Sequence, residues 1–209
     1  MSRKIIQYLK SFGGHIANLY NIINLNFGFK NPNSYTKFRI INQIRKKTRA
    51  NMLIETGTYL GVNAERCSKV FDKVYTIELD KVLAKNAQNH FSNNKKIEVF
   101  WGDAQKLLPG LLEKNEITNA VIFLDAHFSG GPTARGVLPE PAIEELKIIS
   151  NFQEKIKAII IDDFRCFGSE PDFPSKSDLI KAVENYFLPL GFQMTVFLDL
   201  LIIARPPYV

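Results

Sequence analysis

The chain has 209 residues, of which 45% are hydrophobic and 11% aromatic, a composition that supports a packed core and excludes an intrinsically disordered protein. Two cysteines exclude a disulfide framework, and no window approaches the roughly 18 apolar residues of a membrane span, so we expect a soluble, cytoplasmic protein. Residues 1–50 hold ten Lys or Arg and no Asp or Glu, a net charge of +10, whereas the remainder carries −4 of the total +6. This asymmetry favours contact with something anionic; the alternative is that the basic segment packs on the acidic body.

Residues 1–50 are expected to form a basic helical N-terminal extension of a domain that spans 51–209. Helical patterns cover 4–12 and 16–24, and Gly13-Gly14 is predicted to break them. A turn at 31–34 precedes a third predicted helix at 35–48, which leads into the first strand. Seven aromatic residues indicate that this extension packs against something.

Five short apolar runs follow, and helical patterns lie between most of them. Runs without polar alternation are typical of parallel strands that are buried on both faces. The five runs are 52–55, 74–78, 97–100, 120–125 and 158–162. Two further runs, 192–197 and 200–204, are separated by only two residues and predict an antiparallel hairpin. The connection between the third and fourth strands is assigned no helix.

Alternating strands and helices predict the fold class. It is α/β, with a Rossmann-like, doubly wound, mostly parallel seven-stranded sheet that has helices on both faces and ends in the antiparallel hairpin. In such sheets ligands bind beyond the carboxyl ends of the strands. Four of the five first runs end on, or one residue before, an acidic residue, so acidic side chains are expected to line that edge.

The loop after the first strand carries Glu55, Gly57 and Gly61. Gly57 permits a tight turn, and Gly61 allows close helix packing or close approach of a ligand. A dinucleotide-binding fingerprint would need a third glycine, and Glu55 suits a cationic ligand such as the sulfonium of S-adenosylmethionine better than it suits a pyrophosphate. Glu78 can accept hydrogen bonds from ribose hydroxyls, and Asp103 can accept one from the adenine amine. Each acidic residue has an alternative role, the capping of the next helix.

These motifs together resemble the class I S-adenosylmethionine-dependent methyltransferases. The resemblance spans about 51–205 and rests on Glu55-x-Gly57-x-x-x-Gly61, Thr76-Ile77-Glu78-Leu79, Gly102-Asp103-Ala104 and Phe123-Leu124-Asp125-Ala126-His127. It implies that Glu55, Gly57 and Gly61 hold the methionine part, Glu78 the ribose and Asp103 the adenine. The complete cofactor site implied in this way is Glu55, Gly57, Tyr59, Gly61, Glu78, Leu79, Asp103, Ala104 and Asp125.

Three carboxylates are expected to converge on the acceptor side. Asp125, Asp162 and Asp163 follow the fourth and fifth strands, which are neighbours in this topology. Oxygen ligands suit Mg²⁺, which would bind an acceptor's hydroxyls and lower the pKa of one of them. The sequence Ile161-Asp162-Asp163-Phe164 is similar to the metal-dependent macrolide sugar O-methyltransferases. The alternative is that Asp162 and Asp163 cap the loop or pair with Arg165 or Arg135.

His127 and Asp125 are the candidate catalytic residues. His127 lies two residues beyond Asp125 and has an ordinary pKa near neutrality, which suits a general base; the alternative is a structural hydrogen bond. The glycines and proline at 130–132 predict a lid over the acceptor.

The sequence therefore predicts methyl transfer from S-adenosylmethionine to a hydroxyl of a sugar or another small molecule, with Mg²⁺ as a candidate cofactor. Two alternatives are an oxidoreductase that uses NAD on the same scaffold and a non-catalytic module that docks on an anionic partner. We expect a hydroxylated small-molecule acceptor as partner, with an anionic membrane surface and a homo-oligomer as further candidates. Nucleic acid is not expected. Arg3, Lys4 and Lys10 are expected to reach the site or a membrane, and the basic cluster at 45–49 to stay on the surface.

Overall fold

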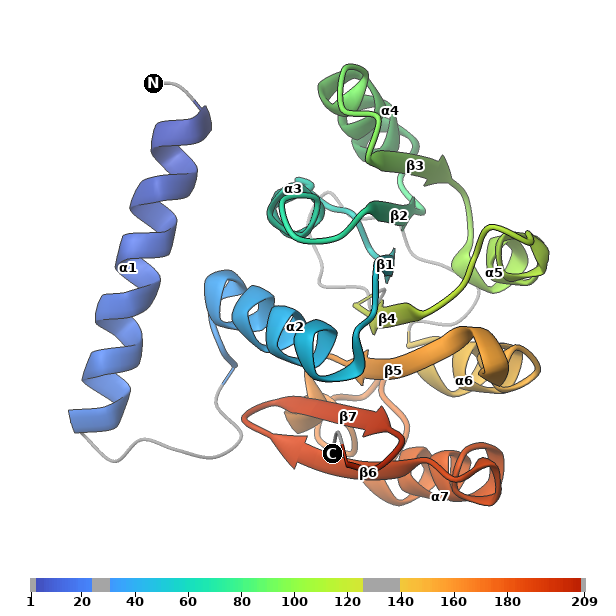
Figure 1. Ribbon diagram of the computed structural model, residues 1–209. Helices are drawn as coiled ribbons and strands as arrows, with labels where there is room; N and C mark the ends of the chain where they lie inside the picture. The colour runs from blue at the N-terminus through green and yellow to red at the C-terminus, as the bar shows by residue number, and fades with distance from the viewer. Residues whose placement is uncertain (1–2, 24–30, 126–139, 208–209) are drawn as a thin grey trace.

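Seven strands form one sheet in the order β3-β2-β1-β4-β5-β7-β6 in the computed structural model, which describes residues 3–23, 31–125 and 140–207 (Figure 1). Strands β1 to β5 run parallel, and β7 is antiparallel to both β5 and β6. The strands are β1 Met52–Thr56, β2 Lys73–Glu78, β3 Ile97–Trp101, β4 Ala120–Leu124, β5 Ile156–Ile161, β6 Gln193–Phe197 and β7 Leu200–Ala204. This arrangement confirms the predicted Rossmann-like sheet and its C-terminal hairpin.

Helices cover both faces of the sheet (Figure 1). They are α1 Arg3–Ile23, α2 Ser34–Thr48, α3 Val62–Cys67, α4 Lys81–Phe91, α5 Ala104–Glu113, α6 Ala142–Ser150 and α7 Lys176–Tyr186, with short 3₁₀ turns at Gln153–Lys155, Phe164–Cys166 and Leu188–Leu190. Successive strand residues point to opposite faces, so each strand feeds two apolar layers. In β4, Ile122 packs in the layer under α5, α6 and α7, whereas Val121 and Phe123 pack under α2, α3 and α4.

Helix α2 belongs to this packing although it lies within the basic first 50 residues. Its residues Ile40, Ile41 and Ile44 are buried against the sheet. The side chain of Asn33 caps the helix by accepting hydrogen bonds from the backbone N–H groups of Tyr35 and Thr36. The predicted helix at 35–48 is therefore confirmed.

The expected break at Gly13-Gly14 is wrong, because α1 is one continuous helix of 21 residues. Gly14 lies against the start of α2, where an added Cβ would come within 2.8 Å of Asn33 Oδ1. A glycine here costs helix propensity but lets the two helices approach closely. Tertiary contact therefore overrides the local preference for a break.

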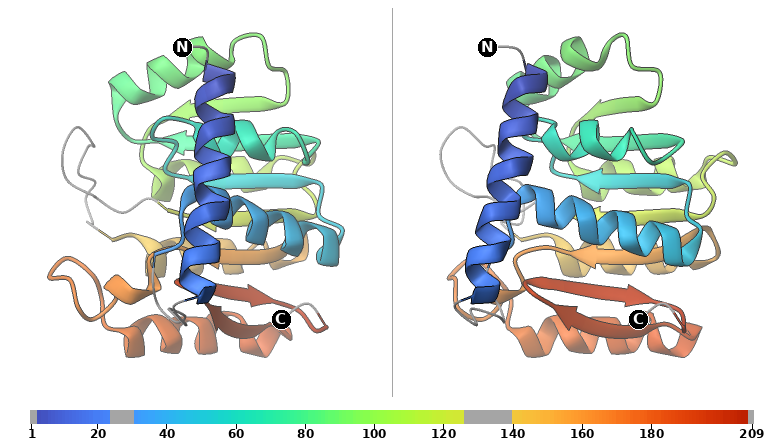
Figure 2. Two further views of the ribbon diagram at one scale, coloured as in Figure 1. Left: turned by 90° about the vertical axis from the view of Figure 1, so that its left-hand side faces the viewer. Right: turned by 60° about the vertical axis from the view of Figure 1, so that its left-hand side comes forward.

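Helix α1 crosses the outside of α3 and the start of α2 (Figure 2). Polar contacts hold it there: Gln7 donates to Glu65, and the guanidinium of the buried Arg66 donates to the Ser11 hydroxyl at 3.5 Å. None of the described helices is both long enough and apolar enough to cross a membrane.

Helix α5 fills the connection to which the sequence assigned no helix. Pro109 lies inside it, next to Gly110, and both residues are poor helix formers. The helix forms because its apolar face is buried, with Leu108, Leu111 and Leu112 in the core. Asp103 caps it by accepting the N–H of Gln105 at 3.0 Å.

Candidate active site

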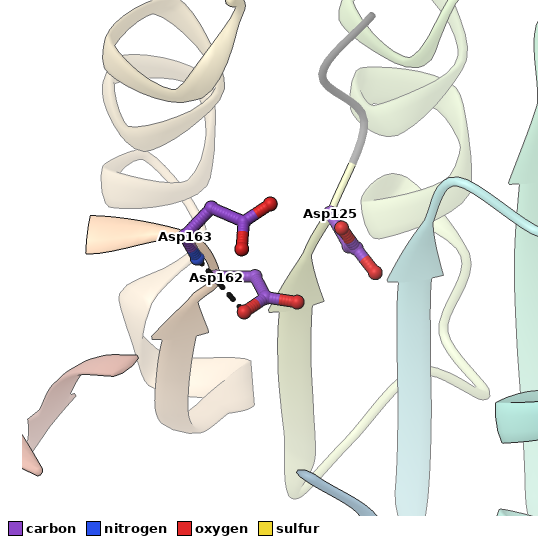
Figure 3. Close-up of side chains that lie close together, drawn as sticks. All are labelled: Asp125, Asp162 and Asp163. Carbon is purple, nitrogen blue, oxygen red and sulfur yellow. Dashed lines mark hydrogen bonds between the residues drawn. The ribbon is translucent and has the colours of Figure 1, made fainter. Parts of the chain in front are cut away.

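The strand register places the acidic residues after β4 and β5 beside one another. Leu124 pairs with Ile161, so Asp125 and Asp162 are the next residues on adjacent strands. The Asp162 N–H donates to the Leu124 carbonyl at 3.0 Å, which continues the ladder past the strand end. One carboxylate oxygen from each of Asp125, Asp162 and Asp163 lies within 4.8 Å of the other two (Figure 3).

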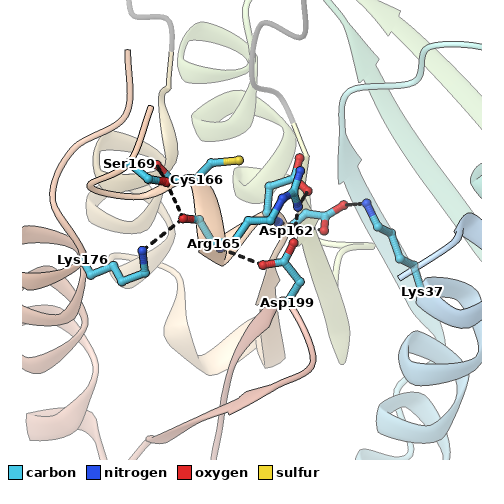
Figure 4. Close-up of polar contacts among 8 residues, drawn as sticks. Lys37, Asp162, Arg165, Cys166, Ser169, Lys176 and Asp199 are labelled. Atoms are coloured by element: carbon cyan, nitrogen blue, oxygen red, sulfur yellow. Dashed lines mark hydrogen bonds and ion pairs between the residues drawn. The ribbon is translucent and has the colours of Figure 1, made fainter. Parts of the chain in front are cut away.

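Asp163 occupies a backbone conformation that L-residues adopt rarely, with φ 52° and ψ 39°. The geometry is supported by Arg165, whose guanidinium donates to Asp163 Oδ1 at 2.6 Å and also pairs with Asp199 (Figure 4). Asp199 lies in the turn between β6 and β7 and accepts the Arg165 backbone N–H at 2.7 Å. The hairpin thus fixes the position of the second aspartate after β5, and the pairing of Asp163 with Arg165, which the sequence analysis gave as the alternative to a metal site, is present.

Lys37 brings a positive charge from α2 into the carboxylate cluster. Its ammonium pairs with Asp162, which is buried (Figure 4). Burial lowers the pKa of Lys37, but the nearby carboxylates of Asp162 and Asp125 raise it by more, so the amine stays protonated. The sequence analysis missed this residue because the pair joins positions 125 residues apart.

The donor chemistry of the cluster fits a hard divalent cation. Asp125, Asp162, Asp163 and Asp199 carry four negative charges against the two positive charges of Lys37 and Arg165, a formal balance of −2. Carboxylate oxygens are the ligands that Mg²⁺ prefers. Lys37 and Arg165 already occupy part of this donor set, so a metal here would compete with Lys37 for Asp162.

The loop after β1 has three residues with positive φ: Gly57 at 93°, Tyr59 at 46° and Gly61 at 69°. Glycine adopts such angles freely, whereas a bulky residue such as Tyr59 does so at a cost of about 1–3 kcal/mol. Strain of this kind collects at ligand-binding sites, and the loop lies at the carboxyl edge of the sheet.

Glu78 ends β2 and is held by two backbone donors. Its Oε2 accepts the N–H of Tyr59 at 2.7 Å, and its Oε1 accepts the N–H of Asp80 at 2.9 Å. The helix that follows is capped by Asp80 instead, so Glu78 is not the cap of α4. A carboxylate oriented by two N–H groups retains lone pairs that can accept ribose hydroxyls.

Large apolar side chains lie exposed on both sides of Glu78. Tyr59 and Leu60 follow β1 and are each about half exposed, and Trp101, at the end of β3, is 53% exposed. A carboxylate between exposed rings fits a ligand with a ribose and an aromatic base, as the predicted S-adenosylmethionine has. Leu79 and Ala104 lie beside this edge, directly after β2 and at the start of α5.

Glu55, near the end of β1, is buried beneath the loop that follows the strand and does not lie on the surface of the protein. It is 1% exposed and accepts from Asn63 Nδ2 at 2.7 Å and from Thr76 Oγ1 at 2.8 Å. Burial raises its pKa to about 7. Through Asn63, Glu55 supports the start of α3. Asp103 caps α5, which is the alternative role that the sequence analysis left open for the acidic residues.

Glu145 is a buried acid that the sequence analysis did not identify. It lies in the first turn of α6, fully buried, and Thr56 Oγ1 donates to its Oε2 at 3.4 Å. Its Oε1 has no hydrogen-bond partner among the residues that the structure describes, and burial raises its pKa to about 8. Thr56 in turn accepts the Asp125 N–H at its carbonyl oxygen, 3.1 Å away, so Glu145 supports the strand end that carries Asp125.

A pocket of about 410 Å³ opens beside the cluster. It is lined by the segment 31–34 and by Lys37, Asn63, Phe123 and Asp125. Residues before and in α2 therefore line part of the acceptor side. His127, Arg135 and the glycine-rich segment at 130–132 lie outside the described residues, so their roles stay predictions.

The fold and this edge define a class I S-adenosylmethionine-dependent methyltransferase. The chain belongs to the ribosomal RNA adenine dimethylase family, whose model matches residues 25–181. That range includes α2, the first five strands and all three clustered aspartates. The family supports methyl transfer over the NAD alternative, and it is at odds with the expectation that nucleic acid is no partner.

Curated relatives match over a shorter stretch. A probable ribosomal RNA small subunit methyltransferase A from Methanococcoides burtonii is 39% identical over 57 residues, which is 27% of this chain and 21% of the relative. The chain thus matches about a fifth of the length of the curated relatives.

Solved structures share the fold at low identity. A putative caffeoyl-CoA O-methyltransferase from Staphylococcus aureus has a TM-score of 0.54 at 17% identity, covering 91% of this chain and 90% of its own. The O-methyltransferase TomG from Streptomyces achromogenes, solved in complex with S-adenosylmethionine, has a TM-score of 0.55 at 16% identity, covering 82% and 79%. These likenesses establish the architecture alone.

Replacing Glu78 by Ala should weaken S-adenosylmethionine binding roughly 10- to 100-fold, because a charge-assisted contact of about 1.5–3 kcal/mol is lost. Calorimetric titration of the folded variant measures this. Glu98→Ala, in the neighbouring strand β3, is the matched control and should bind normally. Unchanged affinity in Glu78→Ala would contradict the ribose assignment.

The buried Glu145 should make stability depend on pH. Its pKa of about 8 in the folded protein lies above the ordinary 4.5, so the folded state keeps a proton that the unfolded chain releases. The free energy of unfolding should therefore fall as pH rises from about 5 to 8, by on the order of 2–4 kcal/mol from this group. Urea unfolding at several pH values measures the slope. Glu145→Gln should make the slope shallower and leave the part that buried Glu55 contributes, whereas Glu144→Gln, on the exposed side of α6, should not change it; equal slopes in all three proteins would refute the burial argument.

Proposed function

We propose that this chain transfers a methyl group from S-adenosylmethionine to an adenine of ribosomal RNA, with the exocyclic N6 as the acceptor atom. The observation that carries the proposal is the family match over residues 25–181, which covers the carboxylate cluster and α2 together. The charge of +10 on residues 1–50 supports a polyanionic acceptor, because phosphates bind basic segments.

The acceptor side suits an amine. Asp125 lines the pocket beside the strand end and can accept a hydrogen bond from an N–H of the adenine amine, which orients the nitrogen lone pair. The nitrogen attacks the sulfonium methyl, the carbon–sulfur bond breaks with its electron pair left on sulfur, and the proton leaves the nitrogen for Asp125 or water. Arg39, exposed on α2, is available to phosphates of the bound strand.

A second candidate is O-methyl transfer to a hydroxylated small molecule with Mg²⁺, which the cluster of Asp125, Asp162 and Asp163 favours. These residues would hold the ion, and bound Mg²⁺ would lower the pKa of an acceptor hydroxyl. The two candidates differ in acceptor atom and in metal dependence, so they are separable by experiment.

The acceptor is tested with radiolabelled S-adenosylmethionine and small-subunit ribosomal RNA that lacks adenine methylation. We expect label in the RNA, recovered as N6-methylated adenosine after digestion. Asp125→Asn should reduce kcat about 100-fold or more, and Glu144→Gln should leave both kcat and cofactor affinity unchanged. Label in hydroxylated sugars and none in RNA would overturn the proposal.

The metal is tested by titrating the protein with Mn²⁺ and by assaying it in EDTA. If the cluster holds a divalent ion, Asp162→Asn should abolish binding and Lys37→Met should tighten it roughly 10-fold, because the competing ammonium is gone. Activity should stop in EDTA and return with Mg²⁺. No binding to either the parent or Lys37→Met, with full activity in EDTA, would eliminate the second candidate.

A further inference from the structure

Helix α1 presents its apolar face to solvent. Besides Tyr20, six of its large hydrophobic residues are each more than half exposed: Ile5, Tyr8, Leu9, Phe12, Ile16 and Leu19. Their spacing of three and four residues places them on one side of the helix. We call these six residues the apolar stripe.

The opposite side of α1 is polar and faces the body of the protein. Gln7, Ser11, Gly14 and Asn18 repeat at four, three and four residues, and Gln7 and Gly14 are buried. Gln7 bonds to Glu65, and Asn18 Oδ1 accepts the Thr36 hydroxyl at 2.9 Å. A helix of a water-soluble protein ordinarily buries its apolar side. The outward orientation of the apolar stripe therefore indicates that it binds an apolar surface outside this molecule.

The positive charge of the helix indicates which kind of apolar surface the stripe binds. Helix α1 carries three basic residues, Arg3, Lys4 and Lys10, and no acidic one, and Lys10 is exposed. A basic amphipathic helix with aromatic residues on its apolar side is the pattern of a helix that lies in the plane of an anionic membrane. Pairing the stripe with that of a second copy would instead bring two helices together that carry only basic charges, which like-charge repulsion disfavours.

The position of α1 agrees with this assignment. Figure 1 shows α1 as the outermost of the described helices on its side of the molecule, so a flat surface can reach its whole length of about 30 Å. It is not apolar enough to cross a bilayer, as holds for all the described helices, so contact is confined to the interface. Tyr8 and Phe12 are side chains that suit the boundary between headgroups and acyl chains.

We propose that α1 docks this protein on an anionic lipid surface, with the apolar stripe inserted below the headgroups and the basic residues of α1 among them. Docking does not depend on which methyl acceptor the site takes, because the stripe points away from α2 and from the pocket.

The test is co-sedimentation of the full chain with vesicles of phosphatidylcholine alone and with 30% phosphatidylglycerol. The parent protein should bind the anionic vesicles and not the neutral ones. The double variant Phe12→Gln, Ile16→Gln should bind the anionic vesicles roughly 10- to 100-fold more weakly, because two inserted side chains are lost. The matched control is Leu188→Gln, Phe197→Gln, which removes two exposed apolar residues elsewhere and should bind as the parent does.

Three results would overturn the proposal. They are no binding of the parent to anionic vesicles, equal binding of parent and double variant, and binding to neutral vesicles as tight as to anionic ones. Light scattering of the lipid-free proteins measures whether the stripe instead binds a second copy of the chain. A parent protein that is a dimer, with a Phe12→Gln, Ile16→Gln variant that is a monomer, would assign the stripe to that second copy. Circular dichroism and a thermal shift with S-adenosylmethionine verify that each variant is folded.

Discussion

Repulsion among the carboxylates at the ends of β4 and β5 is the constraint around which this edge of the protein is organised. Asp162 and Asp163 are almost fully buried, and both lie within 4.8 Å of an oxygen of Asp125. Buried like charges at such distances are strongly unfavourable unless cations accompany them. Lys37 and Arg165 supply the cations, and each arrives from a separate element.

Those two cations link the site to the rest of the fold. Lys37 belongs to α2, which packs Ile40 and Ile41 on the sheet, so the helix is held both by apolar burial and by charge. Arg165 connects Asp163 to Asp199 in the turn of the C-terminal hairpin. The first and last parts of the described chain thus meet at one group of carboxylates, and each has a reason in electrostatics to stay there.

Much of this could be predicted from the sequence, because the signals were local. Buried parallel strands read as uninterrupted apolar runs, and Asp125 and Asp162 follow two of them, so strand order alone brought them together. What failed depended on contacts between distant residues. Gly14 is helical because it touches Asn33, the helix around Pro109 forms because its leucines are buried, and the Lys37 pair spans 125 positions. Glu145 has no motif, since its environment and not its neighbours in sequence sets its pKa.

The side chain of Asn33 contacts two helices through its two amide atoms. Its amide oxygen caps α2, while its amide nitrogen donates to the Gly14 carbonyl at 3.5 Å and to Asn18 at 3.4 Å on α1. Its own carbonyl accepts the backbone N–H of Lys37 at 3.1 Å. One residue therefore connects the outer helix to the backbone of Lys37, whose ammonium neutralises the acidic edge. A force that pulls α1 away from the body of the protein would act first on the bonds of Asn33. It would thereby shift Lys37 and change the position of the positive charge beside the carboxylates.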